Sequence, residues 1–207
     1  DYISKRNKPI FLSTGMSTFS DIKIILKKLN KFKKKDITIM HCISSYPARK
    51  ENLNLNIIDE IRNRYKCKLG YSDHSLDDDA CLIAVAKGAK VIEKHVTISK
   101  SLNGPDHKSS ATITEFKNLI QKIRNFELLL GNSIKRFSKN EIHIQKVARK
   151  SIAAKGRISK YKIIKRKDIC FRRPGTGISP FDIGKVIGKK VTKNIEANTL
   201  ISKKVLS

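Results

Sequence analysis

The chain has no tryptophan, and aromatic residues make up only 6% of its 207 residues. So few rings leave little to stack on exposed bases, which argues against a single-stranded nucleic-acid binder. No apolar run is long enough to cross a bilayer, so we expect no membrane contact of that kind. Residues 1–6 lack the apolar core of a secretory signal, which favours a cytoplasmic protein. They also lack an initiator methionine, so we expect a fragment or a processed product.

Cysteine is scarce and scattered along the chain. The four cysteines are Cys42, Cys67, Cys81 and Cys170, and no two of them form a C-x-x-C pair. This spacing argues against a structural zinc site and against a disulfide framework. We expect two or three of them to be buried as small apolar side chains.

Acidic residues are few, with 18 Asp and Glu against 45 Lys and Arg, which gives a formal net charge of +27. Such a charge suits either a basic patch that follows a phosphate backbone or a lysine-rich surface without that purpose. The basic residues are spread along nearly the whole chain and not gathered in one segment. We therefore expect no specific nucleic-acid partner, although nonspecific attraction at low salt follows from the charge alone.

The first two-thirds of the chain alternates between apolar segments and amphipathic ones. Predicted strands cover 9–13, 37–42, 68–72 and 90–97, and predicted helices follow at 17–29, 54–65, 78–87 and 114–130. Ser17 or Ser20 is the expected cap of the first helix, and Thr114 the expected cap of the last. Four βα units in a row predict an α/β fold with a parallel sheet, either doubly wound or part of a barrel.

The pattern changes near residue 149, where short β-like pieces surround the glycine-rich loop 173–177. This predicts a small, irregular β-rich domain. The expected organisation is an α/β domain over 1–131, a linker over 132–148 with one short helix around Glu141, and the β-rich domain over 149–207.

Polar side chains follow the predicted strands, where parallel α/β folds carry their chemistry. Ser13, Ser44 and Ser72 are hydroxyls of this kind, and His74 and His95 belong to neighbouring strands. The alternation of the fourth strand places His95 on the same face as Glu93. The two histidines either share a divalent metal or are separate hydrogen-bonded structural residues, and spacing alone leaves both open.

Two further segments offer polar groups near these strands. Asp106 follows a Gly-Pro turn and is either a site acid or an Asx-turn residue. The segment 41–47 ends in Ser44, Ser45 and Tyr46, whose hydroxyls suit a phosphate ligand or the cap of the next helix. His41 shares a strand face with Ile39, which favours a core histidine.

Six segments, taken together, resemble the N-acetylneuraminate (sialic acid) synthase family. They are Phe11–Met16, His41-Cys42-x-Ser44-x-Tyr46-Pro47, Gly70-x-Ser72-Asp73-His74, Glu93-Lys94-His95, Gly104-Pro105-Asp106 and Arg172-Arg173-Pro174-Gly175. They occur in the family's order, and the residues from about 149 resemble its antifreeze-like (SAF) domain. The resemblance covers essentially the whole chain.

The resemblance implies the C-terminal half of a (β/α)8 TIM barrel followed by a small SAF (β-clip) domain. It implies a transferase that condenses phosphoenolpyruvate with an N-acylated amino sugar, giving a nonulosonic acid and phosphate. Manganese is the expected metal, with magnesium or cobalt as alternatives. It also implies a domain-swapped homodimer in which the SAF domain reaches the partner subunit's site.

Site roles carry over from the family motifs position by position. His74 and His95 match the metal ligands, and we expect them to be catalytic together with Asp106 and Tyr46. Tyr46 and Asp106 match sugar-side residues, and Arg173 matches the arginine offered to the sugar's N-acyl group. Ser13, Ser44 and Ser72 match phosphoenolpyruvate-binding positions, although some bacterial members carry Asn where Ser44 stands.

The sugar remains open among N-acetylmannosamine and the 2,4-diacetamido precursors of legionaminic and pseudaminic acids. The Arg-Pro-Gly segment at Arg173 resembles bacterial members that use unphosphorylated sugars. Only four of eight βα units are present, so we expect residues 1–207 alone to be inactive. The alternative is a non-catalytic remnant whose SAF domain serves dimerisation or carbohydrate binding.

Overall fold

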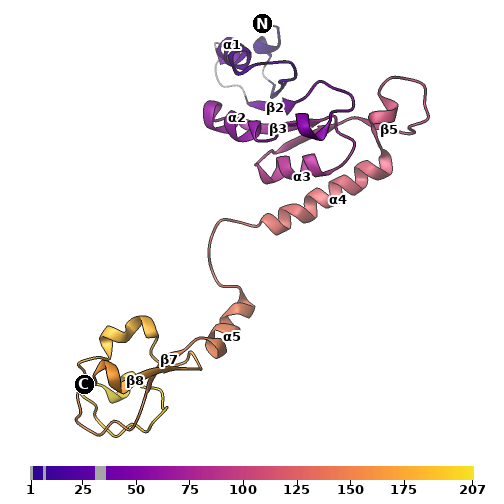
Figure 1. The fold of residues 1–207 in the computed structure, drawn as a ribbon. Helices are drawn as coiled ribbons and strands as arrows, with labels where there is room; N and C mark the ends of the chain where they lie inside the picture. Colours follow the sequence, from indigo (N-terminus) through magenta and orange to yellow (C-terminus); the bar gives the residue numbers. More distant parts are fainter. Residues whose placement is uncertain (1, 7, 31–35) are drawn as a thin grey trace. The chain divides into compact units, whose positions relative to one another are not determined.

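The computed structural model describes residues 2–6, 8–30 and 36–207. Its contacts divide the chain into two compact units, Asp1–Asn132 and Ser133–Ser207 (Figure 1). Among the described residues, no helix combines the length and the hydrophobicity that a membrane span requires.

The first unit is built on a parallel four-stranded sheet with the strand order β1-β2-β3-β4. Its strands are β1 (Ile10–Ser13), β2 (Ile37–Cys42), β3 (Lys68–Asp73) and β4 (Val91–Lys94). Its helices are α1 (Phe19–Asn30), α2 (Ile57–Tyr65), α3 (Asp79–Ala86) and α4 (Ile113–Leu130). Short 3-10 turns cover Ile3–Lys5, Lys50–Asn52 and His107–Ser109. The four expected βα units are therefore present in sequence order.

One face of this sheet carries the hydrophobic core. Ile39 and Leu69 are register partners and point to the same face, where they pack with Ile58, Ile61 and Leu119 of the covering helices. All five side chains are buried. Burying an aliphatic side chain of this size contributes roughly 1.5–3 kcal/mol, so this face holds the sheet and its helices together.

The opposite face of the sheet is only partly covered within the described residues. Phe11 on β1 is 59% exposed. Further along the strands, Cys42, Ser72 and Glu93 are register partners on β2, β3 and β4. Partners in a parallel sheet point to one face, so these three side chains form a row near the strand ends. In a closed barrel this face would be the interior.

The fourth predicted strand is shorter than expected. β4 ends at Lys94, and β5 (Val96–Thr97) pairs instead with β6 (Ala111–Thr112). His95 lies between them, and its carbonyl accepts a hydrogen bond from Ala111 N–H at 2.9 Å. The prediction of one continuous strand through His95 was wrong because this distant segment takes over the pairing.

The expected helix caps were also wrong. At α1 the cap is Thr18, whose Oγ1 accepts from Asp21 N–H at 3.3 Å, while Asp21 Oδ2 accepts from Thr18 N–H at 2.8 Å. At α4 the cap is Thr112, which forms the same reciprocal pair with Glu115. Both caps have an acid three residues later, whereas Thr114 is already inside its helix. The reciprocal arrangement satisfies two free N–H groups at once, which decides the boundary.

The second unit is small and irregular. It contains α5 (Lys139–Ala148) and the antiparallel pair β7 (Ser151–Ala154) and β8 (Ile169–Arg172). Its 3-10 turns cover Arg166–Asp168, Pro180–Lys185 and Lys203–Val205. Ile152, Ile164, Val191 and Ile201 form the centre of its buried core. The predicted linker helix is α5, and it contacts this unit where Gly175 N–H donates to the Lys146 carbonyl at 2.8 Å.

Candidate functional site

His74 follows β3 directly and its ring is held from one side. Its Nδ1 lies 2.7 Å from the carbonyl oxygen of Ile43 in the loop after β2. A carbonyl only accepts hydrogen bonds, so Nδ1 carries a proton, and in the neutral ring the lone pair is on Nε2. This tautomer, with one nitrogen fixed by the backbone, is the one in which imidazole binds metals through Nε2.

Three rings from three strand ends meet beside this histidine. The ring centroids of His74 and His95 are 5.1 Å apart in an edge-on arrangement. Tyr46 lies 4.1 Å from the His74 ring and 5.4 Å from the His95 ring. The structure thus brings together three of the residues expected to be catalytic, with the Tyr46 side chain about half exposed.

Asp106 lies in the loop between β5 and β6, at the edge of the same cluster. Its Oδ2 is 4.0 Å from His95 Nδ1, too far for a hydrogen bond and within range of a charge contact. The loop is held by Thr97 Oγ1, 2.8 Å from His107 Nδ1, and by Ser110 Oγ, which donates to the Asp106 carbonyl at 2.7 Å. The Asp106 carboxylate is exposed and available to a ligand.

Glu93 is a site residue to which sequence reasoning assigned no role. Ser72 Oγ donates to Glu93 Oε1 at 2.6 Å across β3 and β4. The hydroxyl proton of Ser72 therefore points at a carboxylate and is not offered to an anion in this structure. The strand alternation that grouped Glu93 with His95 was the signal that could have identified it.

Cys42 is the second such residue. It is buried, and its Sγ lies 3.9 Å from His74 Nδ1. Burial, more than the nearby Glu93 carboxylate, raises the pKa of the Cys42 thiol. Cys42 is thus a buried side chain in the wall of the site, next to His74.

The two other predicted serines are Ser13, at the end of β1, and Ser44, in the loop after β2. Both are exposed. Ser44 lies against Gly15, where an added Cβ would be only 2.1 Å from Ser44 Oγ. The residue after Thr14 must therefore be glycine for Ser44 to keep this position. Arg173 belongs to the second unit, where it is exposed in the loop after β8.

His41 is a core residue, as its strand face indicated. It is 3% exposed, its Nε2 donates to the Leu53 carbonyl at 2.7 Å, and its ring stacks on Tyr71 at 5.9 Å. Burial lowers the pKa of His41, so the ring remains neutral within the core.

The residues at the three-ring cluster fit a divalent metal held by two imidazoles. His74 offers a free Nε2, His95 is adjacent, and the Asp106 and Glu93 carboxylates keep the surroundings negative. Within the ranges that the structure describes, no three or more His, Cys, Asp or Glu side chains converge on one metal position. His74 and His95 are therefore the two side chains of this cluster that could hold such a metal.

Two protein-family models match the chain. Residues 1–135 match the NeuB family model, and residues 149–206 match the SAF domain model. The chain belongs to the NeuB family. The second domain is a SAF domain.

Relatives of this NeuB chain include named synthases. It is 40% identical over 201 residues to the N,N'-diacetyllegionaminic acid synthase of Campylobacter jejuni, covering 96% of this chain and 60% of that protein. It is 34% identical over 204 residues to the enzyme of the same name from Legionella pneumophila, covering 97% and 57%. The chain thus spans about 60% of the length of these curated relatives.

Solved structures show the same architecture. A putative spore coat polysaccharide biosynthesis protein E from Chromobacterium violaceum superimposes with a TM-score of 0.85 at 24% identity, covering 99% of this chain and 62% of that chain. This likeness supports the fold alone: a curled parallel half-barrel sheet in the NeuB chain, followed by its SAF domain.

Proposed function

We propose that the protein containing this chain condenses phosphoenolpyruvate with an N-acylated amino sugar to give a nonulosonic acid and phosphate. The observation that carries the proposal is the meeting of Tyr46, His74 and His95 at the strand ends of a NeuB chain, with His74 Nε2 left free. In parallel α/β folds this edge of the sheet is where substrates bind.

The proposed metal ligands are His74 and His95, with Mn²⁺ preferred over Mg²⁺ or Co²⁺. A divalent ion at this place would act as a Lewis acid toward the sugar's open-chain aldehyde. The contribution of His74 is a ring whose orientation is fixed by Ile43 before any ligand arrives. Oxygen ligands from substrate or water suit Mn²⁺, and the two imidazoles favour a transition metal over Mg²⁺.

Tyr46 and Asp106 are proposed to contact the sugar. Partial desolvation, more than the nearby Asp106 and Glu93 carboxylates, raises the pKa of Tyr46. Its phenol therefore stays protonated and can donate a hydrogen bond to a sugar oxygen. The exposed Asp106 carboxylate can accept from a hydroxyl or take up its proton.

Ser13 and Ser44 are proposed to donate hydrogen bonds to phosphoenolpyruvate. Ser72 joins them if its hydroxyl turns away from Glu93 when the anion binds. In the overall reaction, the methylene carbon of phosphoenolpyruvate forms a bond to the aldehyde carbon, water adds at C2, and the C2–O bond to phosphate breaks. Both protons of that water are lost as its oxygen becomes the C2 carbonyl, one in effect to the aldehyde oxygen and one to the departing phosphate.

Among the three sugars, we propose the 2,4-diacetamido precursor of legionaminic acid. The two relatives described above are both named for synthesis of N,N'-diacetyllegionaminic acid, and the identity reaches 40%. Arg173 is proposed to reach the N-acyl group from the partner subunit in a domain-swapped homodimer. Four free cysteines suit a reducing bacterial cytoplasm as the setting.

We further propose that residues 1–207 alone do not turn over substrate. The described sheet contains four strands, whereas a closed barrel of this type has eight. The partly uncovered face with Phe11 marks where the other strands would pack. Turnover by the purified 207-residue chain would contradict this statement.

The proposal is tested with the complete protein expressed from its own gene. Phosphate release from phosphoenolpyruvate is measured with the diacetamido sugar, with and without Mn²⁺, in the wild type and in His74→Ala. We expect metal-dependent turnover that His74→Ala abolishes and that His143→Ala, an exposed residue of α5, leaves unchanged. No turnover by the wild type with any of the three sugars would favour the non-catalytic remnant instead.

A further inference from the structure

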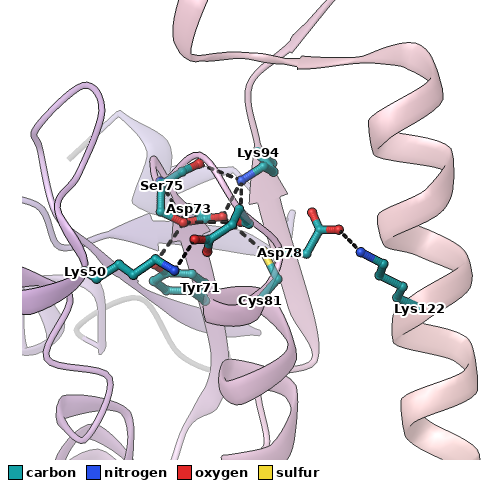
Figure 2. Close-up of polar contacts among 9 residues, drawn as sticks. Lys50, Tyr71, Asp73, Ser75, Asp78, Cys81, Lys94 and Lys122 are labelled. Carbon is teal, nitrogen blue, oxygen red and sulfur yellow. Dashed lines mark hydrogen bonds and ion pairs between the residues drawn. The ribbon is translucent and has the colours of Figure 1, made fainter.

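Behind the histidine cluster, on the other face of the sheet, lies a buried ion pair. Asp73 and Lys94 are register partners at the ends of β3 and β4. Lys94 Nζ lies 2.5 Å from Asp73 Oδ2, and the two side chains are 4% and 0% exposed (Figure 2). Charges removed from water to this extent are costly unless every one of their hydrogen-bonding groups is satisfied.

Asp73 is saturated with donors. Besides Lys94, its carboxylate accepts from Tyr71 Oη at 3.1 Å, from Ser75 N–H at 2.9 Å and from Cys81 Sγ at 3.2 Å. These donors come from β3, from the loop after it and from α3 (Figure 2). A single carboxylate therefore ties together three segments at the end of β3.

Lys94 is equally engaged. Its ammonium also donates to the carbonyl oxygens of Ser75 at 2.8 Å and Asp77 at 3.3 Å. Together with Asp73, these bonds use its three donors. The loop that leaves β3 is thus fastened to the last residue of β4 by backbone as well as side-chain acceptors.

Each partner of this pair immediately precedes one of the site histidines. His74 follows Asp73, and His95 follows Lys94. Neighbouring Cα atoms are about 3.8 Å apart, so fixing Asp73 against Lys94 also restricts the separation of the two histidines on the opposite face. His74 is restricted from both sides, because Asp73 and Ser75 are both bound in the network.

We infer that Asp73 and Lys94 form a positioning pair that sets the spacing and the ring orientation of His74 and His95. This rests on the proposed function in so far as the histidines hold the metal. The pair touches neither substrate nor metal, and its action passes through the backbone. Stability alone does not explain why these two buried positions carry charges, because apolar residues of similar volume often stabilise a fold equally well or better.

The test uses three variants of the complete protein, each checked for folding by circular dichroism. Asp73→Asn/Lys94→Met removes both charges together, so no lone buried charge remains. Lys94→Arg keeps both charges and alters the geometry, which guards against loss of the fold. Lys122→Met is the matched control, because Lys122 forms an exposed ion pair with Asp78 at 2.8 Å in the same region (Figure 2).

Two quantities are measured on each folded variant. The first is the dissociation constant for Mn²⁺ alone, from the electron paramagnetic resonance signal of the free ion. The second is the tautomer of the His74 ring without metal, from ring-nitrogen NMR. We expect the dissociation constant for Mn²⁺ to rise roughly 10–100-fold in the double variant and in Lys94→Arg. Loss of residues that orient metal ligands typically lowers metal affinity by this factor. We also expect the single Nδ1–H tautomer of His74 to be lost in the double variant and unchanged in Lys122→Met.

Unchanged Mn²⁺ affinity and an unchanged His74 tautomer in the folded double variant and in folded Lys94→Arg would overturn the inference. Failure of the proposed function gives a different pattern. If the wild type does not bind Mn²⁺, or if His74→Ala binds it equally well, the proposed metal site is wrong. The metal-free tautomer then still decides whether the pair positions the ring.

Discussion

The start of α4 gives a sharp test, because two threonines stand two residues apart and only one is the cap. Thr112 Oγ1 accepts from Glu115 N–H at 3.2 Å, and Glu115 Oε2 accepts from Thr112 N–H at 2.7 Å. Replacing Thr112 with alanine leaves the Glu115 N–H without its partner. Loss of a threonine cap typically costs about 1 kcal/mol of unfolding free energy.

Thr114→Ala is the matched control for this prediction. Thr114 is exposed inside the first turn of α4, where alanine has the higher helix propensity by a few tenths of a kcal/mol. We therefore expect Thr112→Ala to lower the unfolding free energy by about 1 kcal/mol. Thr114→Ala should leave it unchanged or raise it by up to about 0.5 kcal/mol.

The measurement is urea unfolding of both variants and the wild type, followed by far-ultraviolet circular dichroism. The slopes of the unfolding transitions should agree, so that the midpoints report stability alone. If Thr114→Ala costs as much as Thr112→Ala, the cap has been misplaced. A Thr112→Ala variant within about 0.3 kcal/mol of the wild type would refute the reasoning as well, since that lies well below the usual cost of a lost cap.

The same cap predicts a dependence on pH. The hydrogen bond from Lys100, followed by that from Thr112 N–H, lowers the pKa of Glu115 to about 2. A carboxyl group whose pKa is depressed by folding adds stability above its unfolded value, about 4.3, and this stability is lost as the pH falls toward 2. Glu115 is half exposed, so salt screens its pair with Lys100 and the effect is small. Glu115→Gln should flatten this part of the acid-unfolding profile.

Two further predictions concern the site and the pair behind it. Gly15→Ala would put a Cβ 2.1 Å from Ser44 Oγ, so the hydroxyl must rotate away. We therefore expect a raised KM for phosphoenolpyruvate in the complete protein. The control is Gly156→Ala, which should leave KM unchanged because no atom lies within 4 Å of the added Cβ. Burial tends to raise the pKa of Asp73, but the hydrogen bond and charge of Lys94, with other donors, lower it below its ordinary value. The stability that this ionised group contributes is present above about pH 4 and lost as the pH falls further. Urea unfolding across the acid range should show that loss in the wild type, and an equally steep loss in Asp73→Asn would contradict it.

Much of the first unit was predictable because its signals are local. Apolar runs located all four strands, and the polar residues that follow them located Ser13, Ser44, Ser72 and His74 at one edge of the sheet. Chain connectivity alone places such residues at the strand ends. The family motifs then added roles to these positions, and residues 1–135 match the NeuB family model.

Two features that the sequence did not reveal depend on partners far away in the sequence, and a third depends on a choice between two nearby residues. The pairing of Glu93 with Ser72 requires the register of β3 against β4, which no local pattern contains. The predicted strand through His95 was interrupted because Ala111 N–H binds its carbonyl. The cap of α4 was assigned to the wrong threonine because a propensity for hydroxyl residues cannot tell two nearby threonines apart.

The sequence by itself determined the order of strands and helices and which polar side chains lie at the strand ends. Hydrophobic periodicity suffices for this because it acts between residues a few positions apart. The tertiary structure alone decided that Ile43 fixes the His74 tautomer, that Tyr46 meets both histidine rings, and that Asp73 pairs with Lys94 behind them. Hydrogen bonds and charge pairs depend on distance and direction in space, and only the packed sheet sets these.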